Sequence, residues 1–455
     1  MTRARPASAT FEWIDTLAHR LLRVDRVPLE RLPDWEEDPR TGFLRHRTGR
    51  FFSVVGIEGA DGTDGSRWYQ PILDQPDVGI LGLLAWLGDG VPELLVQGKA
   101  EPGNVNGIQL APTVQATSSN YERVHGGRAV PYLEHFLDPA ARRLAYSCQS
   151  EHGDWFDRKS NRNMVVAVPA KAEPDQGFRW LSLPDLHRML EIDDMVNMDT
   201  RTVLASLSFA STGLLDGRDE SDDLPGALAR SYRSTRSVTG SVADVGRALA
   251  RARRACRLVT RRSPLRGLPG WVRADGVVRH VDGRHFEVVG VDVAGEGREV
   301  DRWSQPMLRA VDTGLAAMLL TRLDGVAHVL VSLRAEAGSR GRVEIGPTVA
   351  SRGRWADVEA EVPPAHLATI LAHCPGGVRF DVVQSEEGGR LFRTRTRHLV
   401  VEGGYVEPGP GHRWLTLGQL EALVARGHAV DIGARSLLAC LQTLVTRDAL
   451  AVDTI

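Results

Sequence analysis

The stretch RWYQP at Arg67–Pro71 returns as RWSQP at Arg302–Pro306, 235 residues later. Other motifs recur at the same spacing, among them PTV at Pro112–Val114 and Pro347–Val349, and QSE at Gln149–Glu151 and Gln384–Glu386. A solenoid repeat is only a few tens of residues long, so this period indicates one domain that was duplicated. Each copy is long enough to bury its own core. We expect two similar domains, residues 1–236 and 237–455.

The composition limits the classes of protein that the chain could be. Of 455 residues, 42% are hydrophobic and 25% charged, and the net charge is −2, which gives no general attraction to nucleic acid or acidic membranes. No apolar run approaches the roughly 20 residues of a membrane span, and no apolar segment follows the basic N-terminus as in a secretion signal. The four cysteines form no CxxC pair. We therefore expect a cytoplasmic protein without a disulfide framework or a zinc site.

Hydrophobic periodicity predicts mixed secondary structure in both copies. Each copy opens with a helical pattern, and Ser241 is placed to cap the second of these helices. The apolar segments Val78–Leu87 and Thr313–Leu323 fit either a strand or a helix, and the acidic stretch Asp216–Asp223 reads as a linker. Short helices are expected at Leu183–Leu190, Asp199–Phe209, Leu417–Val424 and Gly433–Val445. The irregular mixture predicts an α/β fold of the α+β sandwich type in each copy.

Two segments of the first copy are rich in hydrogen-bonding groups. Lys99–Gly107, KAEPGNVNG, could be a hairpin turn, or it could present backbone N–H groups and a cation to a phosphate. Gln109–Tyr121, QLAPTVQATSSNY, could be a polar loop or could bind a sugar or a base edge. The second copy keeps Pro347–Val349 but lacks most of the polar side chains that follow in the first. This difference favours a ligand site in the first copy.

A third segment, SEHGDWFDRKSNRN at Ser150–Asn163, corresponds to SEEGGRLFRTRTRH at Ser385–His398. Arg158 and Arg162 are four residues apart, so on a helix or a tight loop they could bind one diphosphate, although a solvated basic edge has the same pattern. His152 is a candidate acid–base group, although a lone histidine is more often structural. The phosphate-binding loop GxxxxGK[ST], the dinucleotide motif GxGxxG, HExxH and GxSxG are absent.

Taken together, these strings resemble the sugar-nucleotide 2,3-dehydratases of deoxysugar biosynthesis. The resemblance rests on RWYQP, KAEPGNVNG, QLAPTVQATSSNYERVH, SEHGDWFDRKSNRNMVV and the segments RWLSL and RWLTLGQL, and it covers nearly the whole chain. It implies two Nudix-like domains, a homodimer, and loss of the C2 hydroxyl of dTDP-4-keto-6-deoxyglucose as water to give a 3,4-diketo-2,6-dideoxy sugar. It also implies a role in making sugars that are attached to antibiotics and related natural products.

The implied reaction needs an acid and a base but no cofactor. The C3 proton lies α to the C4 ketone, which serves as the electron sink, so no hydride carrier is required. Neither copy has a Nudix box, so we expect no bound metal and no pyrophosphohydrolase activity. A non-catalytic nucleotide-sugar-binding or scaffold protein is the alternative.

The first copy is expected to do the chemistry, because its candidate acid–base residues are absent from the second. These candidates are His152, Tyr121, Asp154 and Lys159, with Glu387, Ala356, Gly389 and Thr394 at the corresponding positions. Two alternatives stay open for the second copy: it binds nucleotide weakly, or it lends Trp303, Arg393 and Arg397 to a pocket shared across the dimer. The substrate-binding candidates are Trp68, Lys99, Asn104, Thr113, Gln115, Ser118, Asn120, Ser150, Trp155, Arg158, Asn161, Arg162, Asn163, Trp303, Arg393 and Arg397. For Trp68, stacking on the thymine or sugar competes with core packing.

Overall fold

The fold was analysed in a computed structural model, which describes residues 6–62, 65–88, 90–117, 129–295, 300–351, 370, 372 and 376–447. The candidates Ser118, Asn120 and Tyr121 lie outside these residues. Both repeats contain helices and antiparallel and parallel strand pairs, as the predicted α/β class requires. Equivalent elements recur at the spacing of the sequence motifs.

Each repeat contributes one large mixed sheet. The first has the order β10 (Arg142–Ser150), β11 (Ser160–Ala167), β6 (Gly79–Trp86), β7 (Glu93–Ala100), β12 (Phe178–Ser182), with β8 (Ile108–Pro112) on β7 and β9 (Val114–Ala116) on β6. The second has the order β24 (Val378–Ser385), β25 (Arg395–Glu402), β20 (Gly314–Leu323), β21 (Val326–Ala335), β22 (Val343–Gly346), with β23 (Val349–Ser351) on β20 and β26 (His412–Leu415) on β21. The two ambiguous apolar segments are therefore strands, β6 and β20. Each pairs in parallel with the strand that follows the third motif, β11 or β25.

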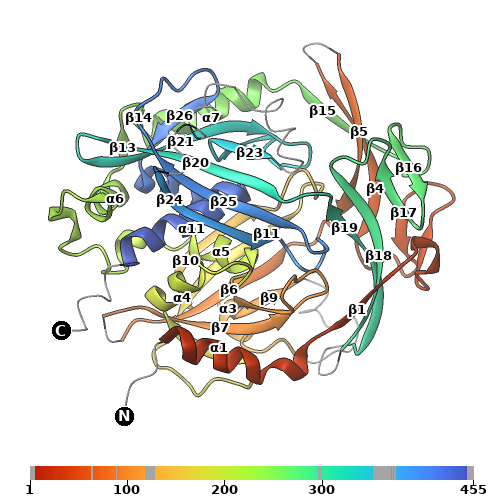
Figure 1. Cartoon of the computed structure of the whole chain (residues 1–455), viewed down its shortest axis with the longest axis horizontal. Helices are drawn as coiled ribbons and strands as arrows, with labels where there is room; N and C mark the ends of the chain where they lie inside the picture. Colours follow the sequence, from red (N-terminus) through yellow and green to blue (C-terminus); the bar gives the residue numbers. More distant parts are fainter. Residues whose placement is uncertain are drawn as a thin grey trace.

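The two small antiparallel sheets each contain a strand from the other repeat. One sheet holds β2 (Trp35–Glu37), β3 (Leu44–His46), β4 (Ser53–Asp61) and β5 (Arg67–Asp74), with β15 (Leu258–Ser263) from the second repeat on its edge. The other holds β16 (Trp271–Ala274), β17 (Val277–His280), β18 (Phe286–Ala294) and β19 (Arg302–Ala310), with β1 (Arg23–Val27) from the first repeat. Figure 1 shows β1 lying along β18 and β15 beside the strands of the first repeat. Neither repeat builds its small sheet alone, so the boundary predicted after residue 236 divides the sequence but not these sheets.

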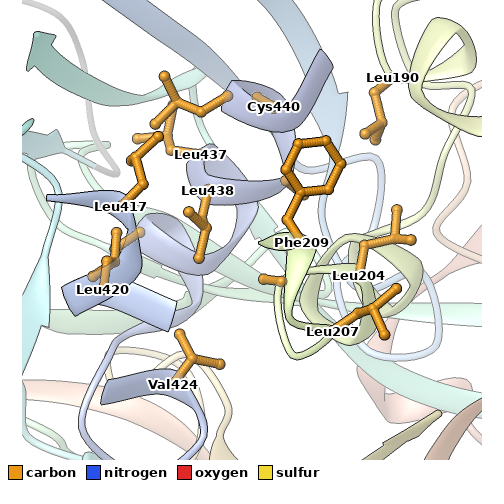
Figure 2. Packing of buried hydrophobic residues seen from close by; sticks show 14 of the residues in the cluster. Leu190, Leu204, Leu207, Phe209, Leu417, Leu420, Val424, Leu437, Leu438 and Cys440 are labelled. Carbon is orange, nitrogen blue, oxygen red and sulfur yellow. The ribbon is translucent and has the colours of Figure 1, made fainter. Parts of the chain in front are cut away.

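Helices fill the space between the two large sheets. They include α4 (Leu183–Met189), α5 (Met198–Leu204), α6 (Leu224–Arg233), α10 (Leu417–Val424) and α11 (Ile432–Thr446). The other α-helices in the described residues are α1 (Pro6–Thr16), α3 (Glu134–Leu137) and α7 (Val242–Ala255). Figure 2 shows Leu204 and Phe209 beside Leu437, Leu438 and their neighbours, so the core is continuous across the repeats. Each fully buried leucine contributes about 2 kcal/mol of transfer free energy.

Side-chain caps explain why these helices begin where they do. Ser182 and Thr416 cap α4 and α10, Asn197 and Asp431 cap α5 and α11, and each accepts a backbone N–H from the first turn. The predicted cap Ser241 is confirmed, and together with Asp244 it forms a capping box. The stretch predicted as a linker leads directly into α6, which packs against β21 and α10 of the second repeat.

Two buried arginines tie the ends of the central helices to the other repeat. The Arg201 guanidinium in α5 donates hydrogen bonds to the carbonyl oxygens of Val196 (2.7 Å) and Ser385 (3.0 Å). Arg435, its equivalent in α11, donates to the carbonyl oxygen of Ser150 at 2.7 Å. Ser150 and Ser385 begin the two copies of the third motif, so each copy of this motif is held by a helix of the opposite repeat.

Candidate active site

The repeats meet at two related junctions, where a turn of one repeat touches a loop of the other. Junction A joins turn 101–107 to loop 386–393, and junction B joins turn 336–342 to loop 151–158. In junction A the N–H of Gly103 donates to the Gly388 carbonyl at 2.7 Å, and in junction B the N–H of Gly338 donates to the Gly153 carbonyl at 2.6 Å. The glycine-rich segment KAEPGNVNG therefore forms a turn, as predicted, and its partner is the third motif of the other repeat.

Glycine is needed in both motifs because the backbones approach so closely. A Cβ atom on Gly103 would overlap the carbonyl oxygen of Leu391, and one on Gly338 would overlap that of Phe156. A Cβ atom on Gly388 would likewise collide with the Asn104 side chain. The matching glycines in the two copies thus allow the loops to pack across the junction.

Junction B contains two of the predicted acid–base residues, and both have charged partners. His152 Nε2 lies 2.8 Å from Glu386 Oε2, and both side chains are about 95% buried. Asp154 lies 3.6 Å from Arg334, which also pairs with Glu336 at 3.2 Å. Burial raises the pKa of Glu386, but the charge and hydrogen bond of His152 hold this pKa well below its usual range. His152 and Asp154 therefore take part in an inter-repeat network of ion pairs.

Other residues of the third motif also bridge the repeats at junction B. The Ser150 hydroxyl donates a hydrogen bond to Glu344 at 2.6 Å, and burial raises the pKa of Glu344 to about 7 despite that bond. Trp155 is 3% exposed and packs in the core shared by the small sheets. These contacts give both residues structural roles.

Beside junction A lies a group of carboxylates with fewer partners, which we call the acidic cluster: Glu101, Glu151, Asp199 and Glu387. All four interact electrostatically, and Lys99 and Lys159 lie among them. Three of the oxygens are buried and have no hydrogen-bond partner in the described part of the chain: Glu151 Oε2, Asp199 Oδ1 and Glu387 Oε2. Unpaired buried carboxylate oxygens are costly and are uncommon outside functional sites.

Neighbouring amides and one lysine fix the geometry of the acidic cluster. Lys99 Nζ lies 3.3 Å from Glu101 Oε1, and Gln115 donates to the same oxygen at 3.0 Å. Asn197 in turn donates to Gln115 at 3.2 Å. Asn161 donates to Glu151, and its own oxygen accepts the Gly79 N–H at 3.1 Å. The predicted site residues Lys99, Gln115 and Asn161 are thus brought together with Lys159.

Burial perturbs the protonation of this cluster. It raises the pKa of Glu387 to about 7, and the carboxylate of Glu101 acts in the same direction. Burial also raises the pKa of Asp199 well above its usual value, and nearby Glu151 adds to the rise. The pKa of Lys159, which is 7% exposed, is lowered because burial outweighs the attraction of Glu151. The site can therefore both donate and accept protons near neutral pH.

Two cavities adjoin junction A. One, of about 290 Å³, is lined by Leu22, Val24, Glu101, Asn104 and Arg393 among others. The other, of about 350 Å³, is lined by Arg26, Arg309, Arg393 and Arg395 together with Asp312 and apolar groups. Arg393 borders both cavities, and Trp303 packs with Leu22 and Val24. The second repeat therefore contributes Arg393 to the same cavity wall as Glu101, and the exchange of β1 packs Trp303 against Leu22 and Val24 of that wall.

Trp68 and Arg158, the first-repeat counterparts of Trp303 and Arg393, lie at junction B. Trp68 packs over Gly59 and beside Ala337 of junction B. Arg158 is in the turn before β11 and Arg162 is inside that strand, so no helix aligns the two guanidinium groups. Arg397 pairs with Asp381 at 2.6 Å.

The three remaining candidates mainly stabilise the backbone. The Thr113 hydroxyl bridges β7 and β6, and Thr348 makes the same bonds in the second repeat. Asn104 donates to two carbonyls of its own turn, and Asn163 donates to Thr202.

The sequence interpretation did not include five residues at this site: Glu101, Glu151, Asp199, Glu387 and Arg390. Glu101 and Glu151 have counterparts in Glu336 and Glu386, so a comparison of the two copies gave no reason to single them out. Asp199 has Gly433 as its counterpart, a difference that could have revealed it. Arg390 lies over the Phe52 ring at 4.1 Å and donates to Gln75 at 3.1 Å.

Comparison with known proteins identifies the family of this chain. A family model described as NDP-hexose 2,3-dehydratase matches it twice, over residues 8–207 and 242–441. A Streptomyces violaceoruber protein named dTDP-4-dehydro-6-deoxy-alpha-D-glucopyranose 2,3-dehydratase is 42% identical over 434 residues, 94% of each chain. Proteins of the same name from Amycolatopsis orientalis and Saccharopolyspora spinosa are 38% and 39% identical, over 92% and 95% of this chain and 87% and 90% of their own lengths. The chain belongs to the NDP-hexose 2,3-dehydratase family.

Proposed function

We propose that this protein is a dTDP-4-dehydro-6-deoxyglucose 2,3-dehydratase. The observation that carries the proposal is the agreement of three relatives in name, at 38–42% identity over more than nine tenths of the chain. The acidic cluster supports it, because the dehydration needs a group that exchanges protons near neutral pH, and the pKa of Glu387 is raised to about 7.

The reaction moves protons without a net change in oxidation state. A base removes the C3 proton, and the bonding electrons form an enolate whose charge rests on the C4 oxygen. When these electrons return, the C2–O bond breaks and an acid protonates the departing hydroxide to give water. The resulting C2–C3 enol then loses its hydroxyl proton and gains one at C2, which leaves ketones at C3 and C4.

The reactive pocket that we propose is the 290 Å³ cavity at junction A, which is lined by Glu101 of the acidic cluster. Among the members of the predicted acid–base pool that the structure describes, Lys159 lies among the carboxylates of the acidic cluster. With its lowered pKa, its amine is suited to act as the base. We assign nucleotide binding to Arg393, which lines both cavities, and to Trp303, which packs against Leu22 and Val24 in the wall of the 290 Å³ cavity.

Three further parts of the proposal rest on the resemblance in sequence. We propose that each repeat is a Nudix-like domain, that two chains form a homodimer, and that the enzyme acts in the cytoplasm in the synthesis of deoxysugars for antibiotics and related natural products. Within the described residues, no helix is long and apolar enough to cross a bilayer. Light scattering on the purified protein tests the dimer.

The direct test is to incubate the purified protein with dTDP-4-dehydro-6-deoxyglucose and to follow the sugar nucleotide by mass spectrometry. The proposal expects the loss of one water molecule while the nucleotide stays attached. Binding without any change in mass would favour a nucleotide-sugar-binding protein, and release of dTMP that depends on Mg²⁺ would favour a pyrophosphohydrolase.

A further inference from the structure

The two repeats place different groups at one equivalent position across the junctions. His152 pairs with Glu386 at 2.8 Å. The residues at the equivalent positions of the other repeat are Glu387 and Glu151, which interact electrostatically in the acidic cluster. The first pair combines an imidazole with a carboxylate, whereas the second combines two carboxylates. Two carboxylates at one site cannot both ionise easily, so one of them tends to keep its proton.

The surroundings of Glu387 leave one of its oxygens available. Glu387 Oε1 accepts the Gly389 N–H at 3.0 Å, which fixes the carboxyl group. Glu387 Oε2 is buried and has no hydrogen-bond partner among the residues that the structure describes. The charged groups that interact with it include Glu101, Arg390, Glu151, Lys159 and Asp199, so groups from both repeats surround it.

The neighbours of Glu387 are also positioned for a ligand. Asp199 and Glu151 are 3% and 6% exposed, and each has a buried oxygen with no partner among the described residues. Gly388, directly after Glu387, packs against Glu101, and Glu101 lines the 290 Å³ cavity. A substrate hydroxyl entering from this cavity would supply the partner that these oxygens lack.

We propose that Glu387, contributed by the second repeat, is the general acid that protonates the departing C2 hydroxyl, and that the active site is therefore built from both repeats. This inference rests on the proposed function. Its counterpart His152 is then a positioning residue that holds the junction through Glu386.

The proton balance closes with Glu387 as acid and Lys159 as base. Lys159 takes the C3 proton, and Glu387 gives its proton to the hydroxide that leaves C2 with the bonding electrons. In the tautomerisation that follows, the enol hydroxyl returns a proton to the Glu387 carboxylate while the Lys159 ammonium delivers one to C2. Both residues are then ready for the next cycle, and no outside reductant or oxidant is needed.

Glu387→Gln tests this assignment, because it removes the transferable proton and keeps the shape of the side chain. The wild type and the variant are incubated with dTDP-4-dehydro-6-deoxyglucose in deuterated buffer, and dehydration and deuterium exchange at C3 are followed separately. The inference expects the variant to dehydrate at least about 100-fold more slowly. It also expects exchange at C3 to continue, since the base is still present. Glu387→Asp, which keeps the acid, should recover part of the dehydration.

Glu344→Gln is the matched control. Glu344 is another buried carboxyl with a raised pKa, and the equivalent position of the first repeat already holds a glutamine, Gln109. This variant should dehydrate as the wild type does.

Three outcomes would overturn the inference. Dehydration by Glu387→Gln at the wild-type rate would exclude Glu387 as the acid. Loss of C3 exchange together with loss of dTDP binding would assign it a structural role. Failure of the wild type to dehydrate this sugar nucleotide would overturn the proposed function, and the inference with it.

Discussion

The buried carboxyl of Glu387 should make the protein less stable in alkaline buffer, and Glu387→Gln should remove this penalty. Burial raises the pKa of this group from 4.5 to about 7 in the folded protein. Between these values the folded protein holds a proton that the unfolded chain has released, so the free energy of unfolding falls as the pH rises through this window. Each pKa unit is equivalent to about 1.4 kcal/mol, which gives a penalty of about 3 kcal/mol above pH 7.

The assay is thermal unfolding of the wild type and Glu387→Gln at about pH 5 and about pH 8.5. At the higher pH the variant should melt about 3 °C above the wild type, given the unfolding entropy of a chain of this length. At the lower pH the two curves should nearly coincide, because Glu387 is then mostly protonated in the folded protein. A variant that is less stable than the wild type at the higher pH would refute the electrostatic account of the acidic cluster.

Other substitutions test separate parts of the structure. His152→Gln should lower the free energy of unfolding by about 3 kcal/mol near neutral pH, because it leaves Glu386 buried without its partner. The loss should shrink below about pH 4, where the unpaired Glu386 of the variant takes up a proton, and an unchanged denaturant midpoint would contradict the ion pair. Trp303→Ala should weaken dTDP binding about tenfold in calorimetry, and Trp68→Ala should affect it less; the reverse order would place the nucleotide at junction B. Leu438→Ala, at a fully buried position of α11, should cost about 2–5 kcal/mol in chemical unfolding, and a cost below about 1 kcal/mol would mean that the inter-repeat core is not tightly packed.

Much of the architecture could be predicted from the repeated motifs, since equivalent elements follow them in both halves. The exchange of β1 and β15 between the repeats could not be predicted. The alternation of polar and apolar residues along a strand predicts which face is buried, but not which strand it pairs with. The apolar segments that became β6 and β20 were ambiguous because strands buried on both faces lose the alternation of polar and apolar residues.

The candidate site shows the same limit of sequence reasoning. Differences between the copies drew attention to Gln115, Asn161 and Lys159, and the glycine-rich segment drew attention to Lys99. The fold brings these four residues to one cluster, and their roles in the reaction stay predictions. The same comparison noted Glu387 only as the residue that replaces His152 in the second copy. Its place in the acidic cluster comes from the packing of loop 386–393 against turn 101–107, which the sequence does not predict. His152 was a candidate because histidine is a common acid–base residue, but in the structure it pairs with Glu386 of the other repeat.

The most direct test of the central claim is the position of solvent deuterium in the product. The wild-type protein, without added cofactor, is incubated with dTDP-4-dehydro-6-deoxyglucose in deuterated buffer, and the product is analysed by NMR. The account predicts a 3,4-diketo-2,6-dideoxy sugar nucleotide that carries deuterium at C2, because the enol is protonated there by an exchangeable group. Recovery of the unchanged sugar nucleotide, with hydrogen retained at C3, would contradict it.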